Sequence, residues 1–147
     1  MEESEIKQVF KDTIDNYPFK THLEEEVYVE GGRIDIRLPD YDVSVESKGE
    51  RGNIKKGLGQ AIYYGEVAND SIYLLAPYNK ITKEVKEVCE THHIGLLTTD
   101  QGGRSIRCLN NVGGLEAFTM VSETDIDLQS AIKEASERTH EVLGGVE

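Results

Sequence analysis

Cysteine, proline and long apolar runs are scarce in this chain of 147 residues. Its two cysteines, Cys89 and Cys108, can form at most one disulfide and belong to no Cys-x-x-Cys or His-Cys spacing. This argues against a cysteine-based metal site and indicates two reduced core residues. Residues 72–76 form the longest apolar run, which is far too short to cross a bilayer. We therefore expect no membrane partner.

The opening segment, Met-Glu-Glu-Ser-Glu, is unlike a signal peptide, so we expect a cytoplasmic protein. Three prolines and a hydrophobic content of 37% are typical of a globular chain rather than a disordered one. A chain of this length buries enough surface for one core. We expect a single domain over residues 1–147, with a core over about 4–98 and a C-terminal extension over about 99–147.

Basic residues are outnumbered, 16 against 28 acidic ones, for a net charge of −12. This balance argues against a generally basic nucleic-acid coat protein, because an acidic protein repels DNA at long range. The excess lies at the two ends: residues 1–30 and 116–147 each carry −6, whereas residues 31–115 contain eleven acids and eleven bases. Any anionic substrate would therefore be bound by the central segment.

Hydrophobic periodicity predicts the order of helices and strands. Helical spacing of apolar residues predicts helices at 5–16, 54–68, 81–92 and 124–143. Alternating or continuous apolar runs predict strands at 23–30, 33–38, 42–48, 71–76, 94–98 and 105–109. The strand–helix–strand order from 71 to 98 indicates a parallel crossover. The expected fold class is α/β, with an αβββαβ core, a mixed sheet flanked by helices, and an extra C-terminal strand and helix.

The strands predicted at 33–38 and 42–48 each have one apolar and one charged face. Side chains alternate across a strand. Asp35 therefore lies on the charged face of the first of these strands, and Glu46 and Lys48 lie on the charged face of the second. Pairing would bring Asp35 beside Glu46 or Lys48. Two carboxylates suit Mg²⁺, which takes a few carboxylate oxygens and keeps waters for a substrate phosphate. The alternative is a solvated outer face with cross-strand ion pairs, which requires no function.

Residues 48–56 carry a local charge of +3 in this acidic chain. Its bases, where phosphate would bind, are Lys48, Arg51, Lys55 and Lys56. The helix that follows contains Gly57 and Gly59, and each glycine costs about 1 kcal/mol relative to alanine within a helix. Close approach of a partner backbone or a nucleic acid is one explanation for them.

Lys56, Gln60 and Tyr64 lie four residues apart on one flank of this helix. Gln60 would bind the attacking water or a phosphate there; alternatively, Gln60 is merely exposed and Tyr64 packs under the sheet. The stripe expected to face the core consists of Ile54, Leu58, Ala61, Ile62, Gly65 and Ala68. We interpret His22 and the pair His92-His93 as loop and helix-end residues rather than metal ligands.

Three motifs in this order resemble the PD-(D/E)xK nuclease superfamily. They are Gly32-Arg33-Ile34-Asp35-Ile36, Val45-Glu46-Ser47-Lys48 and Gly59-Gln60-Ala61-Ile62-Tyr63-Tyr64. The likeness is nearest to archaeal and viral members with a Gly-Arg-x-Asp hairpin and a Gln-x-x-x-Tyr helix, and it covers residues 4 to about 98. No proline precedes Asp35, which departs from the motif that names the family. The resemblance implies a restriction-endonuclease-like fold.

The resemblance also implies roles for individual residues. Asp35 and Glu46 would bind Mg²⁺, or Mn²⁺ in its place, with help from the backbone carbonyl of Ser47. Lys48 would orient the attacking water or stabilise the pentacovalent phosphate. Gln60 would be an accessory active-site residue.

A glutamate of the first helix would complete the site: Glu5, with Glu2 and Glu3 as alternatives. Arg33 would reach the scissile phosphate. The residues expected to contact DNA are Arg33, Arg51, Lys55, Lys56 and Tyr64.

The expected activity is metal-dependent hydrolysis of DNA by an endonuclease that leaves a 5′-phosphate and a 3′-hydroxyl. The small size leaves no separate sequence-reading module, so branched, flapped or single-stranded DNA is the expected substrate. Alternatives are a Holliday-junction resolvase, a viral genome-processing nuclease, or a non-catalytic DNA-binding or interaction module. A homodimer would form through the edge strand at 105–109 or the C-terminal helix.

Overall fold

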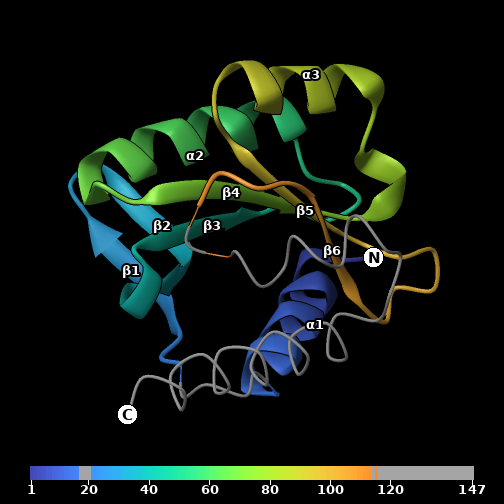
Figure 1. Cartoon of the computed structure of the whole chain (residues 1–147), viewed down its shortest axis with the longest axis horizontal. Helices are drawn as coiled ribbons and strands as arrows, with labels where there is room; N and C mark the ends of the chain where they lie inside the picture. The colour runs from blue at the N-terminus through green and yellow to red at the C-terminus, as the bar shows by residue number, and fades with distance from the viewer. Residues whose placement is uncertain (17–20, 114, 116–147) are drawn as a thin grey trace, which may run out of the picture.

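The computed structural model describes residues 1–16, 21–113 and 115 (Figure 1). Its helices are α1 (Glu3–Asp15), α2 (Ile54–Ala68) and α3 (Lys83–Thr91). Its strands are β1 (Glu24–Val29), β2 (Gly32–Leu38), β3 (Val43–Ser47), β4 (Ser71–Ala76), β5 (Gly95–Thr99) and β6 (Ile106–Asn110). None of these described helices is long and apolar enough to cross a membrane. The helix expected at 124–143 lies outside the described residues.

The six described strands form one mixed sheet in the order β1-β2-β3-β4-β5-β6. The first three form an antiparallel meander, and its first turn passes through Gly31 with φ +87°. β3, β4 and β5 are parallel because α2 and α3 cross over between them, and β6 returns antiparallel at the edge. This topology confirms the α/β class, the αβββαβ order and the edge strand that the sequence predicts.

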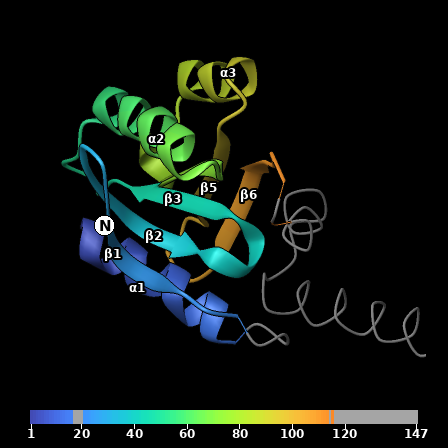
Figure 2. The same ribbon diagram turned by 90° about the vertical axis from the view of Figure 1, so that its left-hand side faces the viewer.

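Helices cover both faces of the sheet: α1 lies on one face, and α2 and α3 lie on the other (Figure 2). Ile6 and Phe10 of α1 pack in one core cluster with Val45 of β3. On the opposite face, Leu58 of α2 packs with Leu74 of β4. Every residue of β3 is therefore buried, and the charged face of this strand lies beneath α2 instead of in water.

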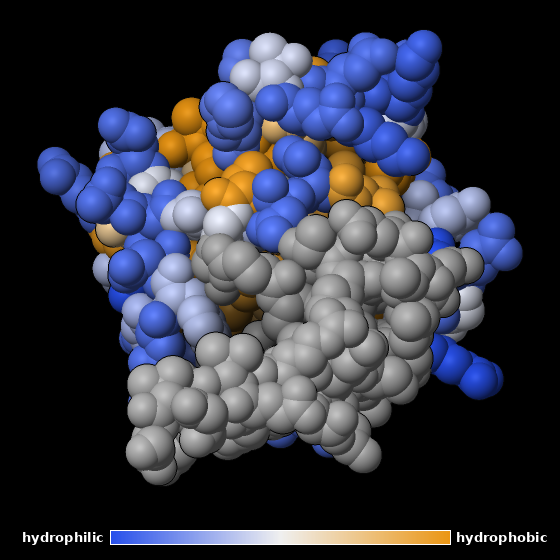
Figure 3. Space-filling model, viewed as in Figure 1, coloured by the Kyte–Doolittle hydropathy of each residue, from blue (hydrophilic) through white to orange (hydrophobic). Residues whose placement is uncertain are grey.

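The buried face of α2 differs from the expected stripe. Ala61 and Gly65 are buried as expected, but Ile62 is 44% exposed and Gly57 is buried. Small residues let the helix approach the sheet closely, and Ile72 of β4 fills the space beside Gly65. Figure 3 shows apolar surface on the side of the molecule where α2 lies. The exposed large apolar residues of this helix are Ile62, Tyr63 and Val67.

Both cysteines are buried and free, which confirms that they are core residues. Burial raises the pKa of the Cys89 thiol and of the Cys108 thiol to about 11. Because the thiolate is the reactive form, neither side chain is a nucleophile near neutral pH.

Candidate active site

Asp35 of β2 and Glu46 of β3 lie opposite each other in the meander. The antiparallel register pairs Ile36 with Val45, and one step further it brings Asp35 opposite Glu46. Both are buried, with 9% and 5% of their surface exposed. Glu46 lies beside Leu74 of β4, which packs with α2. The alternative of a solvated charged face is therefore wrong for these two residues.

Hydrogen bonds fix the position of this carboxylate pair. Oδ2 of Asp35 accepts the backbone N–H of Ser47 at 2.9 Å and the Ser47 hydroxyl at 3.2 Å. The charge of Asp35 also acts on the neighbouring carboxyl group of Glu46. Burial, and then the neighbouring carboxylate of Asp35, raise the pKa of Glu46 to about 8, while the charge of Lys48 lowers it. Glu46 therefore retains its proton near neutral pH.

Two oxygen atoms of the proposed site are buried without a hydrogen-bond partner among the described residues: Oε2 of Glu46 and Oε1 of Gln60. Buried polar atoms are nearly always paired, and an unpaired one costs about 1–3 kcal/mol. An unpaired carboxylate oxygen beside a second carboxylate is the kind of donor set that a hard divalent cation takes. These residues therefore fit the Mg²⁺ that the sequence analysis expects.

Asp35 and Glu46 supply two carboxylates and no more. Residues 1–16, 21–113 and 115 contain no group of three or more His, Cys, Asp or Glu side chains that could hold a metal ion. Mg²⁺ is commonly held by one or two carboxylates, with waters and substrate phosphate oxygens in the remaining positions. Two carboxylates, with the adjacent carbonyl of Ser47, are thus a sufficient protein contribution.

Lys48 follows β3 directly and extends it, since its backbone N–H donates to the carbonyl of Leu75 at 2.9 Å. Its side chain is 15% exposed, and Nζ lies 3.9 Å from Oε1 of Glu46. A positive charge at this distance stabilises the ionised form of the carboxylate. Asp35, Glu46 and Lys48 thus lie together as the sequence predicts.

The first turn of α1 lies against the loop after β3, because a methyl group on Gly49 would collide with the backbone of Glu2 and Glu3. Glu5 is exposed, and its carboxylate accepts the backbone N–H of Glu2 at 3.2 Å, which caps the helix. The charge of Glu3, in contrast, contributes to the raised pKa of Glu46. The choice among Glu5, Glu2 and Glu3 as the helix-one carboxylate of the site stays a prediction.

The basic residues expected to contact DNA are exposed and only loosely paired. Nη1 of Arg33 lies 3.4 Å from Oε1 of Glu26, and Nε of Arg51 lies 3.9 Å from Oε1 of Glu2. Exposed pairs of this kind contribute about 0–1 kcal/mol, so a phosphate could displace the glutamates. The remaining two bases, in the first turn of α2, are Lys55 and Lys56.

Tyr63 and Tyr64 attach α2 to the β1–β2 hairpin. The Tyr63 hydroxyl donates to the carbonyl of Glu30 at 3.1 Å. The Tyr64 hydroxyl lies against Gly32, where any side chain would collide with it. The two rings contact each other edge to face, with their centroids 5.5 Å apart. The structure thus gives Tyr64 a packing role, and the hairpin contact of Tyr63 was not predicted from the sequence.

A second charged cluster, also not predicted, joins β2 and β3 to Asp70, which directly precedes β4. Nε and Nη2 of Arg37 donate to the two carboxylate oxygens of Asp70 at 2.8 and 3.0 Å, and the Ser44 hydroxyl donates to the same carboxylate at 2.6 Å. The Asp70 side chain is fully buried. The hydrogen bonds to Asp70, together with the charge of Asp70, raise the pKa of Arg37. The sequence places Arg37 on the same face of β2 as Asp35, but it does not identify the partner of Arg37, because Asp70 is 33 residues away in the chain.

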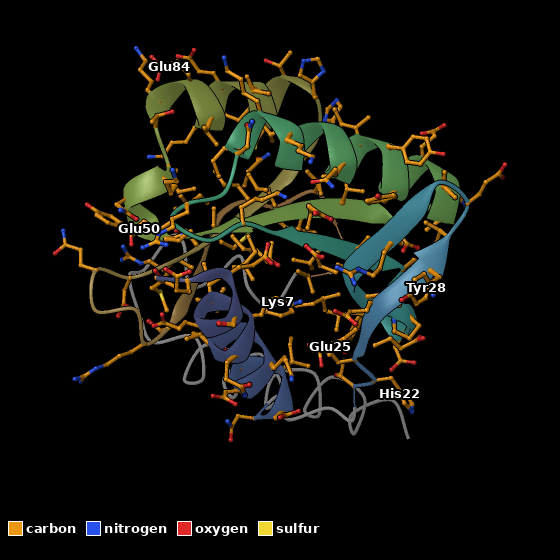
Figure 4. The ribbon with its side chains drawn as sticks, turned by 180° about the vertical axis from the view of Figure 1, so that it is seen from behind. Lys7, His22, Glu25, Tyr28, Glu50 and Glu84 are labelled. Carbon is orange, nitrogen blue, oxygen red and sulfur yellow. The ribbon has the colours of Figure 1, made fainter. Side chains whose placement is uncertain are left out.

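His22 precedes β1. Figure 4 shows it on the opposite side of the molecule from Glu50, which binds the N-terminal ammonium beside the first turn of α1. Nδ1 of His22 lies 2.9 Å from Oδ2 of Asp40, and the His22 side chain is 70% exposed. The interpretation of His22 as a loop residue, rather than a metal ligand, agrees with this position.

No family model matches this chain, and no curated protein matches it. Its structure is similar to the crystal structure of a FdxN element excision controlling factor protein from Anabaena variabilis, with 17% sequence identity and a TM-score of 0.47. The match covers 70% of this chain and 99% of the other. This likeness is too distant to assign an activity.

Proposed function

We propose that this protein is a metal-dependent DNA endonuclease that hydrolyses phosphodiester bonds at Asp35 and Glu46. The observation that carries the proposal is the buried carboxylate pair with one unpaired oxygen, Oε2 of Glu46. A divalent cation would satisfy this oxygen and displace the proton that Glu46 retains near neutral pH. The ammonium of Lys48 lies 3.9 Å from Glu46 and supplies a positive charge beside the proposed metal position.

Each residue of the site has a distinct task in this proposal. Asp35, Glu46 and the carbonyl of Ser47 would hold Mg²⁺ or Mn²⁺. When bound, the metal supplies a water of lowered pKa and a positive charge beside the phosphoryl oxygens. Nζ of Lys48, with three donors and one charge, would orient the attacking water or stabilise the pentacovalent phosphate. Oε1 of Gln60 would accept a hydrogen bond from that water.

The proposed substrate is DNA with distorted or unpaired strands: branched, flapped or single-stranded. The two chain ends each carry −6, whereas residues 48–56 carry +3. Long-range repulsion should therefore weaken binding to plain duplex, and binding should depend on the metal and on contacts close to the site. A four-way junction or a viral replication intermediate would suit the same chemistry. A homodimer formed through the edge strand β6 or the C-terminal helix stays a prediction.

The test is a cleavage panel with three proteins: wild type, Asp35→Ala and Glu84→Gln. Glu84 is an exposed carboxylate on α3 (Figure 4) and serves as the matched control. Each protein is incubated with plasmid, flap, four-way-junction and single-stranded DNA, and with RNA, in Mg²⁺, Mn²⁺ or EDTA. We expect wild type and Glu84→Gln to cleave DNA with either metal, and Asp35→Ala or EDTA to abolish cleavage.

Two results would contradict the proposal. Absence of cleavage by wild type on every substrate, with DNA binding retained, would indicate a non-catalytic binding module. Equal cleavage by wild type and Asp35→Ala would place the active site elsewhere. Cleavage of RNA alone would correct the substrate but keep the site.

A further inference from the structure

Two glycines flank the aliphatic chain of Lys48. A methyl group on Gly57 of α2 would lie 2.9 Å from Cγ and 3.0 Å from Cε of Lys48, and one on Gly52 would lie 3.1 Å from its Cβ and Cδ. Carbon atoms that are not bonded to each other pack best at about 3.5–4.0 Å. Gly52 and Gly57 therefore form a slot for Lys48, and a side chain at Gly57 would displace the lysine.

The contact with Lys48 explains why Gly57 is a glycine. Glycine destabilises a helix relative to alanine, and Gly57 is not among the described residues with positive φ, so the backbone does not require it. Gly59, two residues further along, is different. A methyl group on Gly59 would meet none of the described atoms outside the local helix backbone. The two glycines of α2 thus form a natural pair of test and control positions.

We propose that Gly57, together with Gly52, is a positioning residue that holds the ammonium of Lys48 at the Asp35–Glu46 pair. A lysine side chain has four flexible torsions and a strongly hydrated end, so without restraint its ammonium would spend time in solvent. In the slot, the side chain is 15% exposed and Nζ lies 3.9 Å from Oε1 of Glu46. The consequence for catalysis rests on the proposed function. It is large because displacement of a catalytic group by about 1 Å can lower a rate about 100-fold.

Urea unfolding tests the slot without any activity measurement. The proteins are wild type, Gly57→Ala, Lys48→Ala and the double variant, because Lys48→Ala removes the Cγ and Cε atoms that a methyl group at position 57 would meet. Gly57→Ala should lower the urea midpoint in wild type and raise it in the Lys48→Ala background. Gly59→Ala should raise the midpoint equally in both backgrounds. Equal shifts from Gly57→Ala in the two backgrounds would overturn the slot.

Cleavage kinetics with Mg²⁺ test the positioning role on whichever DNA the wild type cleaves best. Gly57→Ala should lower kcat about 10- to 100-fold and leave KM for DNA unchanged. In the Lys48→Ala background it should leave the residual kcat unchanged, because it acts through Lys48. An equal loss of kcat in both backgrounds would indicate a merely structural effect and overturn the role. If wild type cleaves nothing, the proposed function fails, while the unfolding comparison still decides whether the slot holds Lys48.

Discussion

Replacement of Glu46 by glutamine should make the metal-free protein more stable at alkaline pH. The pKa of Glu46 is about 8 in the folded protein, against an ordinary value of 4.5, because the side chain is buried beside the charge of Asp35. Between these two pH values the folded protein retains a proton that the unfolded chain has lost. The stability that comes from the protonated Glu46 is therefore fully present below about pH 4.5 and is lost as the pH rises through about 8.

The magnitude follows from the size of the pKa difference. Each pKa unit corresponds to about 1.4 kcal/mol, so this one group should lower the free energy of unfolding by up to about 4 kcal/mol between roughly pH 5 and pH 9. Glu46→Gln retains the size of the side chain and a donor toward Asp35, but it does not ionise. The stability advantage of the variant over wild type should therefore grow by up to this amount across the same range.

Urea unfolding in EDTA at several values between pH 5 and 9 measures this directly. Most other titratable groups contribute equally to both proteins, so the difference between the two pH profiles isolates Glu46. Parallel profiles would refute the reasoning, because they would mean that Glu46 ionises in the folded protein as it does in the unfolded chain.

Three further predictions concern the metal and the supports of the site. Mg²⁺ must displace the proton of Glu46, so the apparent Kd measured by titration calorimetry should fall as the pH rises toward about 8; a flat profile would contradict this. Asp70→Ala removes the charged hydrogen bonds of the partly buried Arg37 and should cost about 1.5–3 kcal/mol in thermal unfolding; a cost near zero would mean that water replaces the pair. Tyr63→Phe removes the 3.1 Å hydrogen bond to Glu30 and should cost about 0.5–1.5 kcal/mol in urea unfolding; no loss would mean that this bond does not stabilise the hairpin.

The sequence was sufficient to predict the order of the described elements, because apolar periodicity differs between helices and strands. It was also sufficient to predict that Asp35 and Glu46 lie close together, because strand parity and a short meander leave few ways to pair β2 with β3. Asn53 is the type of residue that caps a helix, and its side chain accepts the N–H of Lys56 at the start of α2. These features depend on residues that are close in the chain.

Features that depend on packing between distant segments were not predictable in the same way. Periodicity alone could not show that small residues bring α2 close to the sheet, so Ile62 was wrongly expected to be buried. The contact between Gly57 and Lys48 and the pair of Arg37 with Asp70 depend on how a helix and a loop lie against the sheet. A single sequence does not specify that geometry.

The most direct test of the central claim is a crystal structure of the protein soaked in Mn²⁺, with anomalous scattering used to locate the metal. We predict a manganese ion within about 2.0–2.6 Å of carboxylate oxygens from both Asp35 and Glu46, the range expected for oxygen ligands of divalent cations. The ion should be absent from crystals of Asp35→Ala. A manganese ion bound elsewhere in a protein that cleaves DNA, with none at this pair, would contradict the account.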